Sequence, residues 1–252
     1  MVPMRSEPSH RSELVNQMLF GEVFDVIGRT RNGEWLEIRL RHDKYEGWVD
    51  AIQVQLLEKE EVKRLTQTEP SFSRQTIDLC VNETNKLTTF LVPGSQLWLP
   101  DGQDHFSVNA DVIRYEGQAL KGKQLRDEMI DFAFGFINAP YLWGGRTPLG
   151  IDCSGFSQIL YRMCGYFIPR DASQQAGIGT ALGFLEESRP GDLAFFDNAE
   201  GRIIHVGIIL PGNQIIHASG TVRVDGLDQY GIYHKEKDTH THRLRLIKSI
   251  LD

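Results

Sequence analysis

A glycine-rich segment that runs directly into a helical pattern constrains the fold of this chain more than any other feature. Glycine and proline crowd residues 144–150, so this segment is expected to be a loop. Asp152 is a favourable N-cap, and the apolar residues beyond it recur at helical spacing. The pattern predicts a helix that begins at Cys153 and buries one face, made of Phe156, Ile159, Leu160 and Met163.

Cys153 lies in the first turn of that predicted helix. The unpaired backbone N–H groups and the positive end of the helix dipole favour a thiolate at this position. A cysteine nucleophile needs this ionised form near neutral pH. The alternative is that Cys153 is a small buried hydrophobic residue, which is the commoner role of an isolated cysteine.

Two histidines lie in a β-hairpin predicted at residues 203–210 and 214–218. With a three-residue loop between the strands, His217 opposes Gly207 and lies diagonal to His205 on one face of the sheet. Diagonal neighbours are about 7–8 Å apart, which is within reach of paired imidazoles. Because the strand around His205 is otherwise apolar, its imidazole is expected to be buried and to have a hydrogen-bond partner.

Cys153, His205 and His217 fit a generalised catalytic triad of nucleophile, base and orienting group. The alternative for His205 alone is a core histidine whose hydrogen bonds are satisfied. No metal or organic cofactor is expected. Three further histidines near the C-terminus lack acidic or cysteine ligands around them and are expected to be solvated at the surface: His234, His240 and His242.

The chain before this region is expected to form two small β-barrels. Residues 1–62 contain short alternating strands, tight turns and a Gly-Trp-Val segment, which are typical of an SH3-like barrel. The charged segment 58–64 is expected to be a solvated helix or linker. Residues 63–119 are expected to form a second, degenerate SH3-like β-barrel, in which 97–99 pairs with 106–108.

Residues 120–252 are expected to form a third domain. The apolar period becomes helical from about Gln124 and stays so until Pro140. The glycine-rich loop, the Cys153 helix and finally the strands follow. Because helices precede the sheet, this domain is expected to be α+β.

Composition and charge exclude several classes of partner. Lysine and arginine number 27 against 34 aspartates and glutamates, a net charge of −7, and no basic block is dense enough to follow a phosphate backbone. Nucleic acid is therefore not expected as a partner. The three cysteines form neither an even disulfide framework nor a Cys-x-x-Cys pair, which suits a reducing compartment.

Neither a signal peptide nor a membrane span is predicted. Charged residues interrupt the apolar ones within residues 1–20, and no apolar run approaches membrane-spanning length. We therefore expect a cytoplasmic, monomeric protein with no membrane partner. A secretory leader in a longer gene product would reverse the cytoplasmic assignment.

Six short motifs, taken in order, resemble the NlpC-type papain-like cysteine peptidases of bacterial cell-wall metabolism. The resemblance covers roughly residues 120 to 250 and implies a C-terminal papain-like domain of helices and antiparallel sheet. The preceding barrels resemble the bacterial SH3-like domains attached to many members. The motifs are Tyr141-x-Trp143-Gly144-Gly145, Asp152-Cys153-Ser154-Gly155-Phe156, Pro169-Arg170-Asp171, Pro190-Gly191-Asp192-Leu193, His205-Val206-Gly207 and His217-Ala218.

This arrangement is similar to the γ-D-glutamyl-L-diamino acid endopeptidases of the dipeptidyl-peptidase VI type, which recycle murein peptides. The resemblance implies that Cys153 attacks the amide carbonyl between γ-D-glutamate and the diamino acid, with His205 as base and His217 orienting it. The Cys153 backbone N–H and the Tyr141 hydroxyl are candidate donors to the oxyanion.

The resemblance also suggests how the substrate is bound. In the enzymes that this chain resembles, an acidic residue binds the free α-amine of an N-terminal L-Ala, and Asp171 is the matching residue. The alternative for Asp171 is an N-cap of the segment that follows it. Ser154, and Tyr45 and Glu22 of the first barrel, are further candidates for substrate binding. Murein peptides with a free L-Ala are therefore the expected substrates.

Four questions stay open from the sequence. The diamino acid could be meso-diaminopimelate or lysine. The enzyme could instead remodel intact stem peptides of the wall. The same nucleophile could serve an acyltransferase, or an amidase that acts on another γ-linked amide. Finally, the chain could be a non-catalytic wall-binding module, although the intact Cys153, His205 and His217 argue against this.

Overall fold

The computed structural model describes residues 1–251, and the chain separates into two compact units, Met1–Lys123 and Gln124–Asp252. Within residues 1–251 no helix is both long enough and apolar enough to cross a membrane. The three cysteines are buried and free of disulfide bonds.

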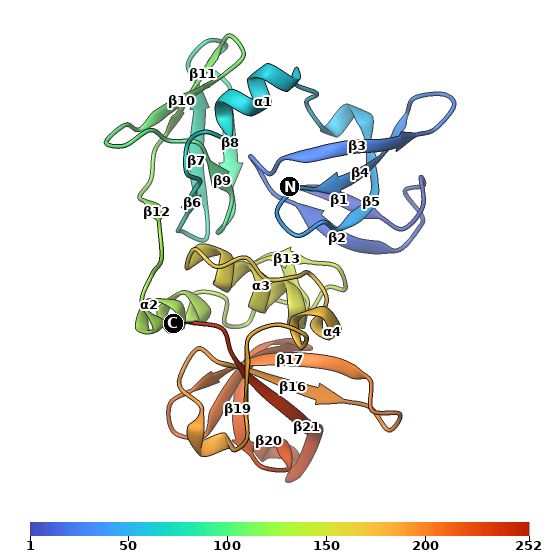
Figure 1. The fold of residues 1–252 in the computed structure, drawn as a ribbon, viewed down its shortest axis with the longest axis vertical. Coiled ribbons are helices and arrows are strands. Elements are labelled where there is room, and N and C mark those ends of the chain that lie inside the picture. The colour runs from blue at the N-terminus through green and yellow to red at the C-terminus, as the bar shows by residue number, and fades with distance from the viewer. Residues whose placement is uncertain (252) are drawn as a thin grey trace. The chain divides into compact units, whose positions relative to one another are not determined.

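The first unit opens with a five-stranded antiparallel sheet in the order β2-β1-β5-β4-β3 (Figure 1). Fully buried apolar side chains from three strands form its core, including Met4, Ile38 and Val49. The predicted strands and turns of the first barrel correspond to β3, β4 and β5. The five strands are β1 (Val2–Arg5), β2 (Leu14–Met18), β3 (Phe24–Arg29), β4 (Trp35–Leu40) and β5 (Glu46–Asp50).

A short 3₁₀ helix, η1 (Ala51–Gln53), and the helix α1 (Lys59–Leu65) lead to two further small sheets in the same unit. The charged segment thus forms a helix, as predicted. The sheets have the orders β10-β11-β7-β8 and β12-β6-β9. Their strands are β6 (Ser71–Ser73), β7 (Asp78–Asn82), β8 (Thr88–Leu91), β9 (Gln96–Leu97), β10 (His105–Val108), β11 (Asp111–Tyr115) and β12 (Ala119–Lys121).

The predicted pairing of 97–99 with 106–108 is wrong. Strand β10 instead pairs with β11 across a two-residue turn that begins at Asn109, whose φ of 52° lies in the left-handed region that asparagine tolerates. Strand β9 pairs with β6. Trp98 and Leu99 are buried in the apolar core of this part of the unit, where they pack rather than form a ladder.

The second unit places its helices before its sheet, as predicted (Figure 1). Helix α2 (Arg126–Phe134) is followed by the two-stranded β13 (Arg146–Thr147) and β14 (Gly150–Ile151). Helices α3 (Cys153–Met163) and α4 (Ala172–Gln175) come next. All eleven residues of α3 are buried, so this helix is covered on every side and not only on its apolar face.

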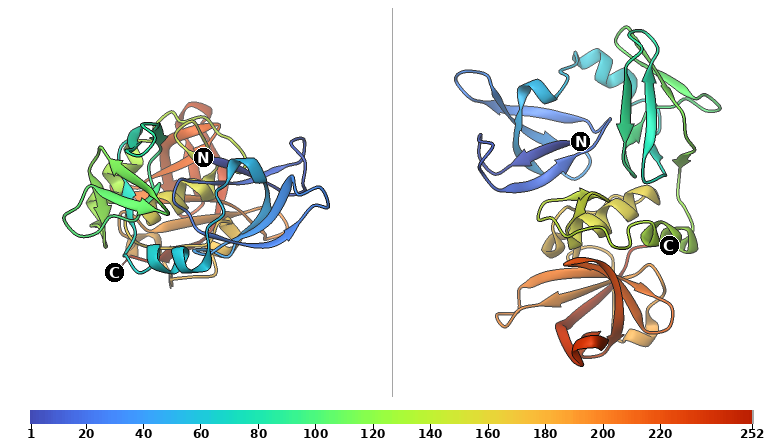
Figure 2. Two further views of the ribbon diagram at one scale, coloured as in Figure 1. Left: turned by 90° about the horizontal axis from the view of Figure 1, so that it is seen from above. Right: turned by 180° about the vertical axis from the view of Figure 1, so that it is seen from behind.

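Six strands of the second unit close into an antiparallel barrel, because β21 pairs with both β16 and β20. The helices lie over one end of these strands, and α3 packs against β17 and β18 (Figures 1 and 2). The elements are β15 (Thr180–Leu182), η2 (Leu185–Glu187), β16 (Leu193–Asp197), β17 (Ile203–Leu210), β18 (Gln214–Ser219), β19 (Thr221–Asp228), β20 (Gly231–His234), η3 (Lys235–Lys237) and β21 (Thr239–Ser249).

Candidate active site

Cys153 is the first residue of α3, as the sequence predicts. Asp152 caps the helix, because its Oδ1 accepts a hydrogen bond of 2.7 Å from the backbone N–H of Gly155. A β-carbon at Gly155 would overlap the carbonyl oxygen of Gly145, so only glycine lets the loop approach the first helical turn this closely. The glycine-rich loop and the helix start therefore form one packed unit around the cysteine.

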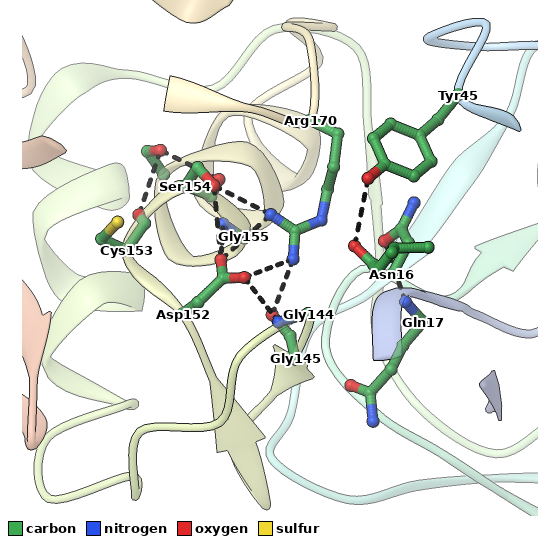
Figure 3. A network of polar contacts seen from close by, with 12 residues as sticks. Asn16, Gln17, Tyr45, Gly144, Gly145, Asp152, Cys153, Ser154, Gly155 and Arg170 are labelled. Carbon is green, nitrogen blue, oxygen red and sulfur yellow. Dashed lines mark hydrogen bonds and ion pairs between the residues drawn. The ribbon is translucent and has the colours of Figure 1, made fainter. Parts of the chain in front are cut away.

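A buried ion pair holds this loop and the helix start together (Figure 3). Arg170 contacts both carboxylate oxygens of Asp152, at 3.0 Å from Nη1 to Oδ1 and 2.6 Å from Nη2 to Oδ2. The same Oδ2 accepts a hydrogen bond of 2.8 Å from the backbone N–H of Gly144. Arg170 Nη1 also donates to Ser154 Oγ at 2.8 Å. The guanidinium thus binds the side chains on both sides of Cys153.

The two histidines predicted to pair lie within hydrogen-bond distance, with 2.8 Å between His205 Nε2 and His217 Nδ1. Strands β17 and β18 pair in the predicted register, with Leu210 opposite Gln214 and Ile208 opposite Ile216. This register puts the two histidines on a diagonal, as expected, and both rings are buried. The prediction that the His205 imidazole is buried with a hydrogen-bond partner is confirmed.

A carboxylate that was not predicted from the sequence lies behind these histidines. Asp225 Oδ2 lies 3.0 Å from His217 Nε2. Arg223 pairs with the same carboxylate, at 2.7 Å from Nε to Oδ2 and 2.8 Å from Nη2 to Oδ1. The signal was present in the sequence. A tight turn at Gly220 sets the β18–β19 register, and that register puts Asp225 diagonal to His217.

His242, which was predicted to be solvated, lies against His205. Its ring stacks on His205, with centroids 4.3 Å apart and planes 25° apart, and it is half-buried. His234 is buried as well, so the prediction of solvated histidines is wrong for these two. His240 is exposed and pairs with Asp228 at 2.9 Å. The pairing of β21 with β16 and β20 closes the barrel and carries His242 inward, and a sequence pattern does not show this closure.

Burial decides the protonation of the Cys153 thiol. It raises the pKa of Cys153 to about 12, with a further contribution from the Asp152 carboxylate. The backbone N–H of Val206, Arg170 and the N–H of Ser154 act in the opposite direction but are outweighed. The effect of the Val206 N–H indicates that the thiol lies against β17, next to His205. Burial thus opposes the thiolate that the helix terminus favours.

The pKa of His205 is lowered, which favours a neutral imidazole beside the neutral thiol. Burial, together with the neighbouring His217 and His242, holds the pKa of His205 well below 6.5. Thiol and imidazole are both neutral near pH 7. His205 can then accept the thiol proton at the moment when Cys153 attacks a carbonyl.

Tyr141 lies close to the thiol. Burial raises its pKa to about 12, and the next two causes are the charges of Cys153 and Asp152. Its side chain is 37% exposed, and its backbone N–H donates to Gly220 O at 2.9 Å. A phenol with a raised pKa stays protonated near neutral pH, so Tyr141 can donate a hydrogen bond to a developing oxyanion.

The remaining candidate substrate-binding residues fall in both units. Asp171 is the N-cap residue of α4, but its carboxylate makes no capping hydrogen bond, so the capping alternative for this side chain is wrong. Ser154 Oγ lies in the Arg170–Asp152 network. In the first unit, the Tyr45 hydroxyl donates to Val15 O at 3.3 Å, and buried Glu22 accepts a hydrogen bond of 2.8 Å from the Leu19 N–H.

Residues 1–251 contain no group of three or more histidine, cysteine, aspartate or glutamate side chains that could hold a metal ion. The reactive groups that the structure brings together are a thiol, an imidazole pair with a carboxylate behind it, and the donors near Cys153. These groups suit nucleophilic attack on a carbonyl followed by acyl transfer.

Comparison with known proteins relates both ends of the chain to described families. Residues 138–243 match the family model described as "NlpC/P60 family". Residues 4–54 match the model described as "Bacterial dipeptidyl-peptidase Sh3 domain".

Two curated relatives align with most of the chain. It is 30% identical over 225 residues to the "Gamma-D-glutamyl-L-lysine dipeptidyl-peptidase" of Bacillus subtilis (strain 168), across 81% of this chain and 72% of the relative. It is 27% identical over 263 residues to the "Dipeptidyl-peptidase 6" of Lysinibacillus sphaericus, across 95% of this chain and 94% of the relative.

The fold is also similar to a solved structure, that of an NlpC/P60 family protein from Bacillus cereus ATCC 10987. The TM-score is 0.76 at 21% sequence identity, and the match covers 94% of this chain and 82% of the other. At this identity the similarity supports the fold alone.

Proposed function

This chain belongs to the NlpC/P60 family of peptidases, and from that premise we propose that it hydrolyses the amide bond between γ-D-glutamate and a diamino acid in murein peptides. The α+β fold with an N-terminal SH3-like domain and the peptidase class, both predicted from the sequence, are confirmed by the family matches. The bond, the substrate and a role in cytoplasmic recycling of murein peptides are the proposal. The names of the relatives from B. subtilis and L. sphaericus support it.

The observation that carries the proposal is the 2.8 Å contact between His205 and His217 on β17 and β18, next to a cysteine at the start of α3. His205 Nε2 is engaged with His217, so Nδ1 is the nitrogen left to take a proton. A buried cysteine whose thiol lies against the strand that carries this base is the arrangement needed for nucleophilic acyl transfer.

In the proposed reaction, Cys153 Sγ attacks the γ-carbonyl of D-glutamate while its proton passes to His205 Nδ1. The Cys153 backbone N–H and the Tyr141 hydroxyl donate to the oxyanion that forms. The His205 imidazolium then protonates the leaving amine of the diamino acid, and the C–N bond breaks. Water, deprotonated by the same imidazole, hydrolyses the thioester and restores the thiol.

We propose that Asp171 binds the free α-amine of an N-terminal L-Ala. A longer or acylated substrate has no free ammonium to pair with that carboxylate and would therefore bind more weakly. This is how a recycling enzyme would refuse stems that are still linked to glycan. Ser154, and Tyr45 and Glu22 of the first unit, are proposed as further substrate-binding residues.

The test is hydrolysis of L-Ala-γ-D-Glu-meso-diaminopimelate and its L-lysine counterpart, each with a free or N-acetylated amine, with products identified by mass. We expect cleavage of the free-amine peptides and loss of at least about 10³-fold in kcat for Cys153→Ala. The Asp171→Asn variant should lose activity on the free peptide through KM and approach the activity seen on the N-acetylated one.

Three outcomes would contradict parts of the proposal. Equal cleavage of free and acetylated peptides would remove Asp171 as the amine anchor and favour remodelling of intact stems. Turnover only in the presence of an acceptor amine would indicate an acyltransferase. Folded protein that cleaves none of the four peptides would remove the proposed substrate.

A further inference from the structure

We propose that Asp225 is a positioning residue that fixes the tautomers of His217 and His205, so that the lone pair of His205 is on Nδ1 and can accept the Cys153 proton. The proposal rests on the roles assigned to Cys153, His205 and His217 in the proposed function. It extends the site from two histidines to a chain of three hydrogen-bonded side chains on three consecutive strands.

The sheet builds this chain by repeating one geometric relation. His217 lies opposite Arg223 in the β18–β19 pairing, and Asp225 lies two residues further along β19 on the same face. Asp225 is thus diagonal to His217, just as His217 is diagonal to His205 in the β17–β18 pairing. The two contacts measure 3.0 Å and 2.8 Å.

Asp225 is in the ionised form that this role requires. It is 8% exposed, and burial alone would raise the pKa of its carboxyl. The hydrogen bonds from His217 and Arg223 outweigh burial and hold the pKa of Asp225 below its ordinary value. An ionised carboxylate has no proton to donate, so it acts only as a hydrogen-bond acceptor.

The proton positions follow from this single constraint. Because Asp225 only accepts, a His217 ring that carries a single proton has it on Nε2, and its Nδ1 is then an acceptor. His205 must then donate its Nε2–H to His217 Nδ1. The other nitrogen of neutral His205, Nδ1, therefore carries a lone pair.

Without the carboxylate, the opposite arrangement becomes available. His217 could carry its proton on Nδ1 and donate it to His205 Nε2. His205 would then hold its own proton on Nδ1 and could not accept one from Cys153. The populations of the two arrangements set the fraction of enzyme that can react, and a base held in the wrong tautomer loses much of its catalytic effect.

The other groups around the pair do not supply this constraint. His242 stacks face to face on His205, and Phe196 lies beside the same ring with centroids 5.8 Å apart. These two rings restrict the orientation of the His205 ring, but neither accepts a hydrogen bond from His217 Nε2. Arg223 contacts the carboxylate rather than either imidazole. Among the described residues, Asp225 is the acceptor bonded to His217 Nε2.

The experiment combines kinetics with histidine ¹⁵N NMR on the full chain. Asp225→Ala and Asp225→Asn should lower kcat about 10- to 100-fold, as is typical when the partner of a ligating or catalytic histidine is removed, with KM changed less than about twofold. In the ¹⁵N spectra, the His205 signals, assigned with a His205→Gln variant, should move from the Nε2–H form toward a mixture of tautomers. The matched control is Asp228→Asn. Asp228 is on β19, like Asp225, but its carboxylate pairs with His240 at the surface.

Unchanged tautomers and unchanged kcat in both Asp225 variants would overturn the proposal. A lower melting temperature with unchanged tautomers would also overturn it, in favour of a purely structural role. Asp225→Asn keeps the shape of the side chain, so it remains informative if Asp225→Ala does not fold. Wild-type protein that cleaves no murein peptide would refute the proposed function, while the NMR measurement would still decide the tautomers.

Discussion

The energies at Cys153 explain why residue-level reasoning about the nucleophile was incomplete. A helix N-terminus stabilises a negative charge by about 0.3–1 kcal/mol, and by up to about 2 kcal/mol in favourable partly buried sites. Burial raises the pKa of the thiol from 9.0 to about 12, which corresponds to roughly 4 kcal/mol against the thiolate. Burial is the larger effect. In the proposed mechanism, the neutral thiol therefore transfers its proton to His205 during attack.

Gly207 is the residue that makes room for the histidine pair. A β-carbon at this position would lie 2.9 Å from the His217 β-carbon and 2.6 Å from Ile215 Cδ1. The isoleucine end can rotate away, but the His217 β-carbon is attached to the β18 backbone. We expect Gly207→Ala to displace His217, to destabilise the protein by about 1–3 kcal/mol, and to lower kcat by roughly 10- to 100-fold.

Chemical denaturation and peptide hydrolysis would measure these effects. The matched control is Gly226→Ala on β19, where the nearest atom to an added β-carbon is 3.5 Å away, an ordinary contact distance. This control should keep wild-type activity. Wild-type kcat in Gly207→Ala would show that the strands adjust without disturbing the contact between His205 and His217.

At the scale of elements, the short-range sequence pattern was sufficient to predict strand pairing wherever a tight turn set the register. The helix at Cys153, its Asp152 cap and the β17–β18 pairing follow from local residue types and one loop length. The same reasoning, applied to the turn at Gly220, would have found Asp225. It could not find His242, because the pairing of β21 with β16 joins residues about fifty positions apart.

In the first unit the pattern failed for a different reason. Strand β2 carries two buried polar residues, Asn16 and Gln17, so its sequence lacks the alternation that indicates a half-buried strand. Strand β1 has four residues and contains Pro3, which lowers strand propensity. Strand β2 pairs with β1, and β1 joins the rest of the sheet where Arg5 pairs with Trp48 of β5, which is a long-range contact.

The ion pair between Arg170 and Asp152 joins two elements and is expected to be worth more than an exposed pair. The exposed fractions of the two side chains are 1% and 8%. Arg170→Met would leave the Asp152 charge buried without its guanidinium, so we expect a loss of about 3–5 kcal/mol of stability. The Arg170→Met variant should also have a lower kcat, because the glycine-rich loop and Cys153 would be held less firmly. Urea denaturation and peptide hydrolysis measure the two effects.

Arg64→Met is the matched control for that variant. Arg64 contacts both oxygens of Glu61 on α1, but its side chain is 51% exposed. Solvent screens such a pair, and we expect its loss to change stability by at most about 1 kcal/mol. If Arg170→Met cost no more than Arg64→Met, the buried pair would not be what holds the loop to α3.

At the scale of the whole molecule, the second unit collects its candidate site from one helix and from four strands of a closed barrel. Cys153 comes from α3, His205 from β17, His217 from β18, Asp225 from β19 and His242 from β21. Closure of the barrel therefore buries several titratable groups together. Since unfolding exposes all of them at once, the stability of this unit should depend on pH in a defined direction.

Stability of the second unit should fall as the pH drops from about 6.5 to about 4.5. The folded protein holds the pKa of His205 well below 6.5, and that of His242 at about 4, so in this range the unfolded chain binds more protons. Each such proton lowers the free energy of unfolding by up to about 1.4 kcal/mol per pH unit. The carboxyl of Asp225 has a lowered pKa and contributes stability that is lost only below about pH 4, outside this window.

Hydrogen exchange of the β16–β18 amides at pH 7, 6 and 5 would measure how steeply the stability of the second unit changes with pH. The His205→Gln variant should have a smaller slope of stability against pH. The Cys153→Ala control leaves both imidazoles in place and should keep the wild-type slope. Equal slopes in wild type and both variants would show that His205 titrates alike in the folded and unfolded chain.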